Sequence, residues 1–362
     1  MHTVLILTVS IGNGHNQAAF NINQKLHAAG YEVKTIDLLQ TEHYGFNTFL
    51  SKAYQKLIEY KPELFRHICK MSKIDKFDNV KYMLAKMNQR IIGRLVKKYQ
   101  PDMIICTHFF PLAAAAAYKN KYCSSFKLVG IVTDYIVHPI WEVANVDQYF
   151  VAHSSLVKQF KHCSNPLTIV IPSGIPIGLD FIPTIRSTDI NRILVMTSGQ
   201  TDQSMLDMIA VLQALPRHIE ISFVTGKDTE RKKQLDQLTT DNTNFKIYGF
   251  TDQVASLMKT TGLLITKPGG LTVTEALATA TPLLVFSPIP GIEEDNARFL
   301  EMNLLGYWAR NKNQLNELIT ELLQSPEKRM LISQRMLTLQ NSQATNSIVH
   351  YLTADMDRKV AL

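Results

Sequence analysis

A short apolar run, a glycine turn and the start of a helix, in that order, constrain the fold of this chain most. The clearest case is residues 262–266, which predict a buried strand, followed by Lys267-Pro268-Gly269-Gly270 and a helix with Glu275 in its first turn. Backbone N–H groups and the helix dipole then point at the turn, which favours an anion such as a diphosphate. Taken alone, these residues are equally typical of an ordinary strand-to-helix turn.

The same order of elements occurs in both halves of the chain. Residues 4–9 predict a strand, 18–29 a helix and 32–38 the next strand, and a second series begins at residue 192. Such alternation gives parallel sheets, and uninterrupted apolar runs are typical of strands covered on both faces. We therefore expect an α/β fold with two Rossmann-like, doubly wound domains facing an interdomain cleft, where open parallel sheets bind ligands.

The domain limits follow from breaks in this pattern. A chain of 362 residues is long enough for two domains of common size. Residues 1–178 are predicted to form the N-terminal domain, 179–190 a linker of little periodicity, and 191–340 the C-terminal domain. Residues 341–362 predict a helix that we expect to pack back on the N-terminal domain.

Basic residues concentrate in residues 41–100. This segment holds thirteen Lys or Arg and five acids, a net charge of +8, whereas the whole chain carries +7. Aromatic residues interleave with the basic ones, as in helices that lie on an anionic bilayer, although a solvated face of ordinary helices is the alternative. No nucleic-acid motif occurs, and no run reaches the roughly 18 apolar residues of a membrane span. We expect contact with an anionic membrane surface, without crossing it, and no binding of nucleic acid.

The four cysteines, at positions 69, 106, 123 and 163, are irregularly spaced. They form no metal-ligand pattern and no CxxC pair, so the sequence predicts no metal site and a reduced, cytoplasmic protein.

The turn after the first predicted strand contains Gly12-Asn13-Gly14-His15. His15 would project into the cleft, where an imidazole of near-neutral pKa can take a proton from a hydroxyl group. The alternative is a dinucleotide loop with an incidental histidine. Gln17 stands at the last glycine position of G-x-G-x-x-G, which disfavours that alternative, although Asp37 lies at roughly the distance of a ribose-binding acid.

Polar and aromatic residues follow other predicted strands as well. Because the carboxyl ends of parallel strands meet at one edge of a sheet, we expect these residues to face the cleft too. The alternatives are an aromatic core edge in the N-terminal domain and an acidic first helical turn in the C-terminal domain. The residues are His108 and Pro111 after 103–106, Asp134, His138 and Trp141 after 128–132, and Glu293 and Asn296 after 283–286.

These motifs occur in the same order in one family. Over about residues 1–340 the chain resembles the bacterial processive diacylglycerol glucosyltransferases and the plant monogalactosyldiacylglycerol synthases. It is more distantly similar to the peptidoglycan GlcNAc-transferase. The resemblance implies a GT-B glycosyltransferase that binds a UDP-sugar in its C-terminal domain and a lipid acceptor in its N-terminal domain. It rests on Gly12-Asn13-Gly14-His15, on residues 132–135 with His138 and Trp141, and on residues 146–152, 174–177 and 266–276.

The resemblance also implies a role for each matching residue. His15, oriented by Asp134, would be the catalytic base. The acceptor would be bound by Gly14, His108, Pro111, His138 and Trp141. The UDP-sugar would be bound by Ser198, Gly199, Gly226, Gly249, Phe250, Pro268, Gly269, Gly270, Thr272, Glu275, Glu293 and Asn296. Within this set Gly249 and Phe250 would hold uracil, the 269–272 segment the diphosphate, Glu275 the ribose, and Glu293 and Asn296 the sugar. No metal ion and no cofactor are implied, because the UDP-sugar is a substrate.

The expected activity is transfer of a hexose, first of all glucose, from its UDP-sugar to diacylglycerol with inversion, on the inner face of the cell membrane. Two departures from the family bear on this expectation. Ile292 replaces a sugar-contacting Gln, which leaves the donor sugar open. Residues 197–202 contain one glycine where relatives have a glycine-rich loop, which leaves open weaker diphosphate binding or a different acceptor. The alternatives are a transferase acting on another lipid, such as a polyprenyl-linked acceptor, and a non-catalytic nucleotide-sugar sensor at the membrane. A nicotinamide oxidoreductase lacks support in the Gly12 loop.

Overall fold

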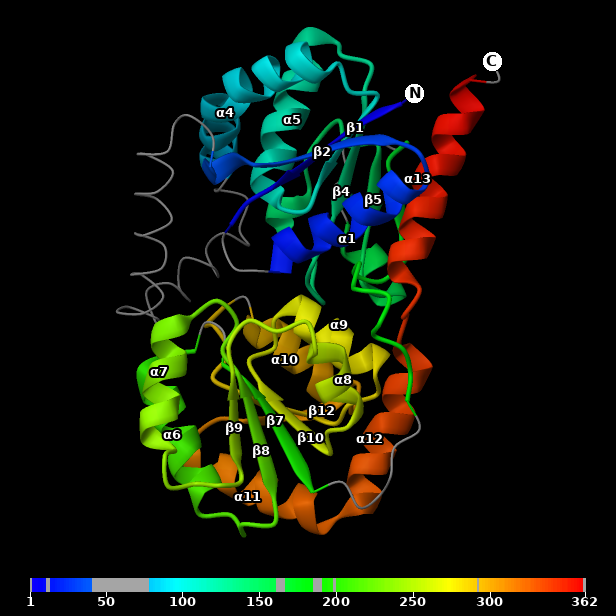
Figure 1. The fold of residues 1–362 in the computed structure, drawn as a ribbon. Helices are drawn as coiled ribbons and strands as arrows, with labels where there is room; N and C mark the ends of the chain where they lie inside the picture. The colour runs from blue at the N-terminus through cyan, green and yellow to red at the C-terminus, as the bar shows by residue number, and fades with distance from the viewer. Residues whose placement is uncertain are drawn as a thin grey trace. The chain divides into compact units, whose positions relative to one another are not determined.

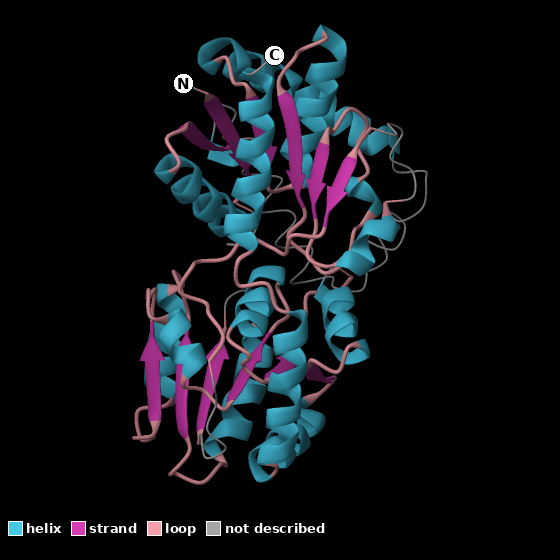
Figure 2. Ribbon diagram, turned by 90° about the vertical axis from the view of Figure 1, so that its right-hand side faces the viewer, coloured by secondary structure: helices cyan, strands magenta, loops and turns pink. Residues whose placement is uncertain are grey.

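The computed structural model of this chain describes residues 2–10, 14–40, 78–160, 167–184, 191–197, 200–291 and 293–360 (Figure 1). The chain divides into two compact units, Met1–Leu179 with Gln343–Leu362, and Asp180–Ser342. Each unit contains a six-stranded parallel sheet with helices on both sides (Figure 2). These two sheets confirm the predicted doubly wound α/β class. No helix among the described residues is long and apolar enough to cross a membrane.

The sheet of the first unit has the order β2-β1-β3-β4-β5-β6. The chain passes from β1 to β2 on one side and then returns to place β3 on the other, so the strand order reverses between β1 and β3. The strands are β1 (Thr3–Thr8), β2 (Glu32–Asp37), β3 (Met103–Cys106), β4 (Lys127–Ile131), β5 (Gln148–Phe150) and β6 (Ile169–Ile171). The helices are α1 (Gly14–Ala28), α4 (Asp78–Tyr99), α5 (Phe109–Tyr122) and α13 (Ala344–Val360), with the short η1 (Leu38–Gln40), η3 (Pro139–Trp141) and η4 (Ser154–Gln159).

Both faces of this sheet are buried. In β1, Leu5 and Leu7 pack in a core with residues of α4 and α5, whereas Val4 and Ile6 pack in a second core with residues of α1 and α13. Figure 1 shows these two helix pairs on opposite sides of the strands. Because successive side chains of a strand point to opposite faces, both sets must be apolar, which explains the uninterrupted apolar run.

The sheet of the second unit has the order β12-β11-β10-β7-β8-β9, and its strand order reverses between β7 and β10. Helix α11 packs on α6, and α12 packs on α9. The strands are β7 (Arg192–Met196), β8 (Glu220–Val224), β9 (Phe245–Tyr248), β10 (Leu263–Thr266), β11 (Leu283–Phe286) and β12 (Gly306–Ala309). The helices are α6 (Asp202–Gln213), α7 (Thr229–Leu238), α8 (Val254–Lys259), α9 (Gly270–Ala278), α10 (Glu293–Met302), α11 (Lys312–Gln324) and α12 (Pro326–Leu339).

Two helices begin earlier than predicted. Helix α1 begins at Gly14 instead of residue 18, so His15 lies in its first turn. Helix α9 begins at Gly270, with Gly269 as its N-cap, so Glu275 lies in the second turn of the helix. The prediction that Glu275 lies in the first turn was wrong. Gly269 has the ordinary extended backbone of an N-cap (φ −65°, ψ 139°), and glycine is accepted at this position, so the helix begins at the turn itself.

Candidate active site

In each sheet the strand order reverses between two neighbouring central strands. Ligands of open parallel sheets bind at such a point, beyond the carboxyl ends of the strands. In the first unit this point lies between β1 and β3, where His15 contacts Thr107, and in the second unit it lies between the paired strands β7 and β10. Of the residues singled out from the sequence, His15 and His108 follow the two strands at the first point, and Pro268, Gly269 and Gly270 follow β10 at the second.

His15 connects the two loops of the first unit. Its Nδ1 lies 2.8 Å from the carbonyl oxygen of Thr107, the first residue after β3, and 3.0 Å from Oγ1 of Thr133, the second residue after β4. A carbonyl oxygen only accepts hydrogen bonds, so Nδ1 carries the hydrogen, and Nε2 of the neutral ring keeps its lone pair. The arrangement therefore leaves Nε2 available to take a proton.

The surroundings of His15 keep its ring neutral at physiological pH. Burial lowers the pKa of His15 below its ordinary value of 6.5, and the charge of Asp134 and the hydrogen bond to Thr107 only partly oppose this effect. Asp134 was predicted to orient His15. Thr107 and Thr133 hold the Nδ1 side of the ring, and the Asp134 carboxylate stabilises positive charge on it.

Aromatic rings extend from His15 across the ends of β3 and β4. The His108 ring meets His15 edge-on with ring centroids 4.6 Å apart, and Phe109 lies 4.3 Å from His108 and 6.4 Å from Trp141. Burial and the proximity of His15 hold the pKa of His108 well below its ordinary value, so this ring is neutral as well. The structure thus brings together three residues predicted from distant segments.

The remaining predicted acceptor residues belong to the same loops. His108 and His138 each cap a helix, because their Nδ1 atoms accept hydrogen bonds from the backbone N–H groups of Phe110 at 3.1 Å and Ile140 at 3.2 Å. Pro111 is buried in the first turn of α5. Gly14 is the first residue of α1, whereas Gly12 and Asn13 lie outside the described residues. The acceptor-binding roles of these residues stay predictions.

Asp37, the candidate ribose ligand of a dinucleotide site, is engaged within the protein. Its carboxylate accepts hydrogen bonds from the backbone N–H groups of Ser10 at 3.3 Å and Leu39 at 3.0 Å, and from the Gln40 amide at 3.1 Å. The Ser10 hydroxyl donates to it as well. Asp37 therefore fixes the ends of β1 and β2, which agrees with the weak dinucleotide motif.

In the second unit the amino end of α9 lies at the strand-order reversal. Its N-cap, Gly269, offers no side chain to the amide groups of the first turn. Such amides, together with the helix dipole, favour an anion. Within α9, burial raises the pKa of Glu275 from 4.5 to about 8, so this carboxyl is protonated at neutral pH.

The predicted sugar ligands lie on α10 and contact the same loop. Asn296 is fully buried and its Nδ2 donates to the carbonyl oxygen of Pro268 at 2.9 Å. Glu293 binds Lys267 through Oε1 at 2.5 Å, and its Oε2 accepts the backbone N–H of Ile289 at 2.8 Å. Both side chains thus fix α10 to its surroundings, and their contacts with a sugar stay predictions.

The other predicted donor residues follow neighbouring strands. Gly226, after β8, has a positive φ of 63°. A Cβ placed on Gly249, after β9, would lie 3.9 Å from the carbonyl oxygen of Gly226, so the two turns are in contact. Phe250 is 74% exposed, with the Lys227 ammonium 5.7 Å from its ring centroid. Ser198 and Gly199 lie outside the described residues, as does Ile292.

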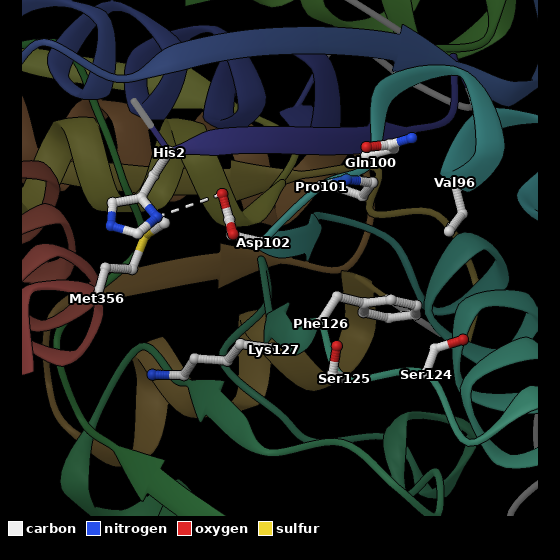
Figure 3. Close-up of a pocket in the computed structure, with 10 residues that line it drawn as sticks. All are labelled: His2, Val96, Gln100, Pro101, Asp102, Ser124, Ser125, Phe126, Lys127 and Met356. Atoms are coloured by element: carbon white, nitrogen blue, oxygen red, sulfur yellow. Dashed lines mark ion pairs between the residues drawn. The ribbon is translucent and has the colours of Figure 1, made fainter. Parts of the chain in front are cut away.

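A pocket of about 600 Å³ lies at the opposite edge of the first sheet (Figure 3). It borders the amino ends of β1, β3 and β4, and His2 and Asp102 form an ion pair of 3.3 Å beside it. No residue predicted for the site lines this pocket. Within the described part of the chain, no group of three or more His, Cys, Asp or Glu is arranged to hold a metal ion.

Two family models match the chain, one for each sheet. Residues 15–177 match the monogalactosyldiacylglycerol (MGDG) synthase model, and residues 194–350 match the glycosyltransferase family 28 C-terminal domain. The processive diacylglycerol beta-glucosyltransferase of Bacillus pumilus is 27% identical over 369 residues, which cover 98% of this chain and 95% of that protein. The chain thus carries an MGDG synthase domain and a glycosyltransferase family 28 C-terminal domain, and it is a glycosyltransferase.

The fold of this glycosyltransferase is that of solved GT-B enzymes. MurG of Acinetobacter baumannii matches with a TM-score of 0.65 and 13% identity, over 98% of this chain and 100% of that one. The spinosyn rhamnosyltransferase SpnG in complex with thymidine diphosphate matches with a TM-score of 0.64 and 15% identity, over 97% and 100%. At these identities the likeness concerns the fold.

Three residues of this glycosyltransferase, Thr107, Thr133 and Lys267, lie in segments singled out from the sequence but were given no role there. Each is the first or second residue after a strand. Thr107 and Lys267 follow β3 and β10, which stand at the strand-order reversals, and Thr133 follows β4, the neighbour of β3. A polar residue after an apolar strand placed them at the sheet edge, but their partners, which give them a role, are not visible in the sequence.

Proposed function

We propose that this glycosyltransferase transfers a hexose, with glucose as the first candidate, from a UDP-sugar to diacylglycerol with inversion of the anomeric configuration. The hydrogen bond from His15 Nδ1 to the Thr107 carbonyl is the observation that carries the proposal. It leaves the Nε2 lone pair of a neutral ring as a base beside the loops of an open parallel sheet. The names of the full-length relatives support diacylglycerol as the acceptor.

In the proposed reaction His15 Nε2 takes the proton of the acceptor hydroxyl. The acceptor oxygen then attacks the anomeric carbon, and the bond from that carbon to the β-phosphate oxygen of the UDP-sugar breaks. UDP leaves with the electron pair, and the amide groups at the amino end of α9 stabilise its charge. Asp134 stabilises the imidazolium that forms on His15, since its charge raises the pKa of that ring.

We further propose that the enzyme works as a peripheral protein at an anionic membrane surface, on the inner face of the cell membrane. The net charge of +8 in residues 41–100 supports this. Of that segment, residues 41–77 lie outside the described residues, and α4 contains the remainder of its basic residues. The donor and the acceptor are the proposed partners, and no metal or cofactor is proposed.

The test is transfer from radiolabelled UDP-glucose, UDP-galactose and UDP-GlcNAc to diacylglycerol in anionic liposomes. We expect labelled glycolipid from one donor, about 10²- to 10⁴-fold less of it with His15→Ala, and unchanged transfer with the control His27→Ala, an exposed residue of the same helix. A β-linked product would establish inversion. The absence of product with every donor, from a protein that binds UDP, would contradict diacylglycerol as the acceptor.

A further inference from the structure

Lys267 and Glu293 join two consecutive loops at the carboxyl edge of the second sheet. Lys267 directly follows β10, and Glu293 is the first residue of α10, which follows the neighbouring strand β11. Their ion pair has an N–O distance of 2.5 Å, and the two side chains are 18% and 8% exposed. The other carboxylate oxygen of Glu293 accepts the Ile289 N–H, so the carboxylate is held at both oxygens.

This ion pair lies directly against the proposed diphosphate turn. A Cβ placed on Gly269, the N-cap of α9, would lie 3.6 Å from Glu293 Oε1 and 4.0 Å from Lys267 Nζ. An uncompensated carboxylate in this position would repel a diphosphate, and in a largely buried place the repulsion is weakly screened. A lysine that cancels the charge removes the repulsion and also fixes the loop.

We propose that Lys267 is a positioning residue for the donor, which acts by neutralising and orienting Glu293 beside the diphosphate turn. The inference rests on the proposed function, because it assumes that a UDP-sugar binds at the amino end of α9. It assigns Lys267 an action through Glu293 rather than a contact of its own with the phosphates.

A double-mutant cycle separates these two actions. The variants are Lys267→Met, Glu293→Gln and their combination, with Lys267→Arg as the conservative variant. The matched control is Lys246→Met, since Lys246 forms an exposed ion pair of 3.7 Å with Glu220 in the same sheet. UDP affinity is measured by calorimetry without acceptor, and KM for donor and acceptor is measured in the transfer assay.

We expect Lys267→Met to weaken UDP binding about 30-fold, because it leaves a buried carboxylate without its partner. The KM for the donor should rise with it, whereas the KM for the acceptor should stay unchanged. Neutralising Glu293 as well should restore UDP affinity to within about threefold of the unmodified protein, and Lys267→Arg and Lys246→Met should stay in that range. A merely structural lysine would lower the thermal unfolding midpoint without this recovery.

Two results would overturn the proposal. The first is a double variant that binds UDP as weakly as Lys267→Met, which would mean that Lys267 contacts the phosphates itself. The second is unchanged UDP affinity in Lys267→Met. If Lys267→Met does not fold, Lys267→Arg and Glu293→Gln still decide, because the proposal expects Glu293→Gln to bind UDP at least as tightly as the unmodified protein. Failure of transfer to diacylglycerol with the expected UDP affinities would contradict the acceptor and leave the role of Lys267 standing.

Discussion

The protonated carboxyl of Glu275 has a consequence for stability that can be measured without substrate. Burial raises the pKa of Glu275 from 4.5 to about 8, so the folded protein binds this proton more tightly than the unfolded chain. The stability that this proton contributes is fully present below pH 4.5 and is lost as the pH rises through about 8. If the whole pKa difference acts, the free energy of unfolding falls by about 4 kcal/mol between pH 5 and pH 9.

Glu275→Gln removes the ionisation and keeps the shape of the side chain. Because Glu275 is only half-buried, access of water reduces the cost of ionising it in the folded protein. Between pH 5 and pH 9 we therefore expect the free energy of unfolding of the variant to rise by about 2–4 kcal/mol relative to that of the unmodified protein. Urea unfolding at both pH values measures this change, with Glu317→Gln, an exposed residue of α11, as the control. The same stability difference at pH 5 and pH 9 would refute a raised pKa of Glu275.

Three further predictions concern the first unit. Because burial lowers the pKa of His15 below 6.5, kcat/KM should be constant above that pH and decrease only in more acidic solution. A pH–rate profile in which kcat/KM already decreases above pH 7 as the solution is acidified would contradict a buried neutral base. Thr133→Val should lower kcat about fivefold, through loss of one hydrogen bond to His15, while Thr133→Ser retains it, and equal rates for both variants in the transfer assay would disprove the contact. Asp37→Ala should lower the free energy of unfolding in urea by about 1–3 kcal/mol without changing UDP affinity, because two backbone N–H groups lose their acceptor, and weaker UDP binding would show a role in the donor site instead.

The sequence predicts most of the architecture because burial on both faces leaves a direct trace in it. In β1 every residue from Val4 to Leu7 is buried, so the strand appears as one apolar run. The edge strand β12 (Gly306–Ala309) was not predicted, since four residues that include two half-buried aromatic side chains show no such run. The start of α9 was placed too late because a pair of glycines is equally typical of a turn and of a helix N-terminus.

The candidate site was predictable where it depends on strand ends. His15, His108 and Trp141 each follow a different strand of one sheet, and the parallel topology brings their rings together. The tautomer of His15 was not predictable, because it depends on a backbone carbonyl 92 residues away whose direction no side-chain pattern encodes. The partner of Glu293 likewise lies 26 residues earlier, on another loop.

The two acids around the amino end of α9 are uncharged or compensated at neutral pH, each by a different means. Glu275 keeps its proton because burial disfavours the carboxylate, and Glu293 forms an ion pair with Lys267 beside it. Either carboxylate, if ionised and unpaired, would oppose the attraction of the helix N-terminus for a diphosphate. A protonated carboxyl can still donate to and accept from ribose hydroxyls, and a compensated carboxylate can still accept from a sugar. Acidic side chains and an anionic ligand can therefore share one site, provided that the site controls where each proton and each counter-charge lies.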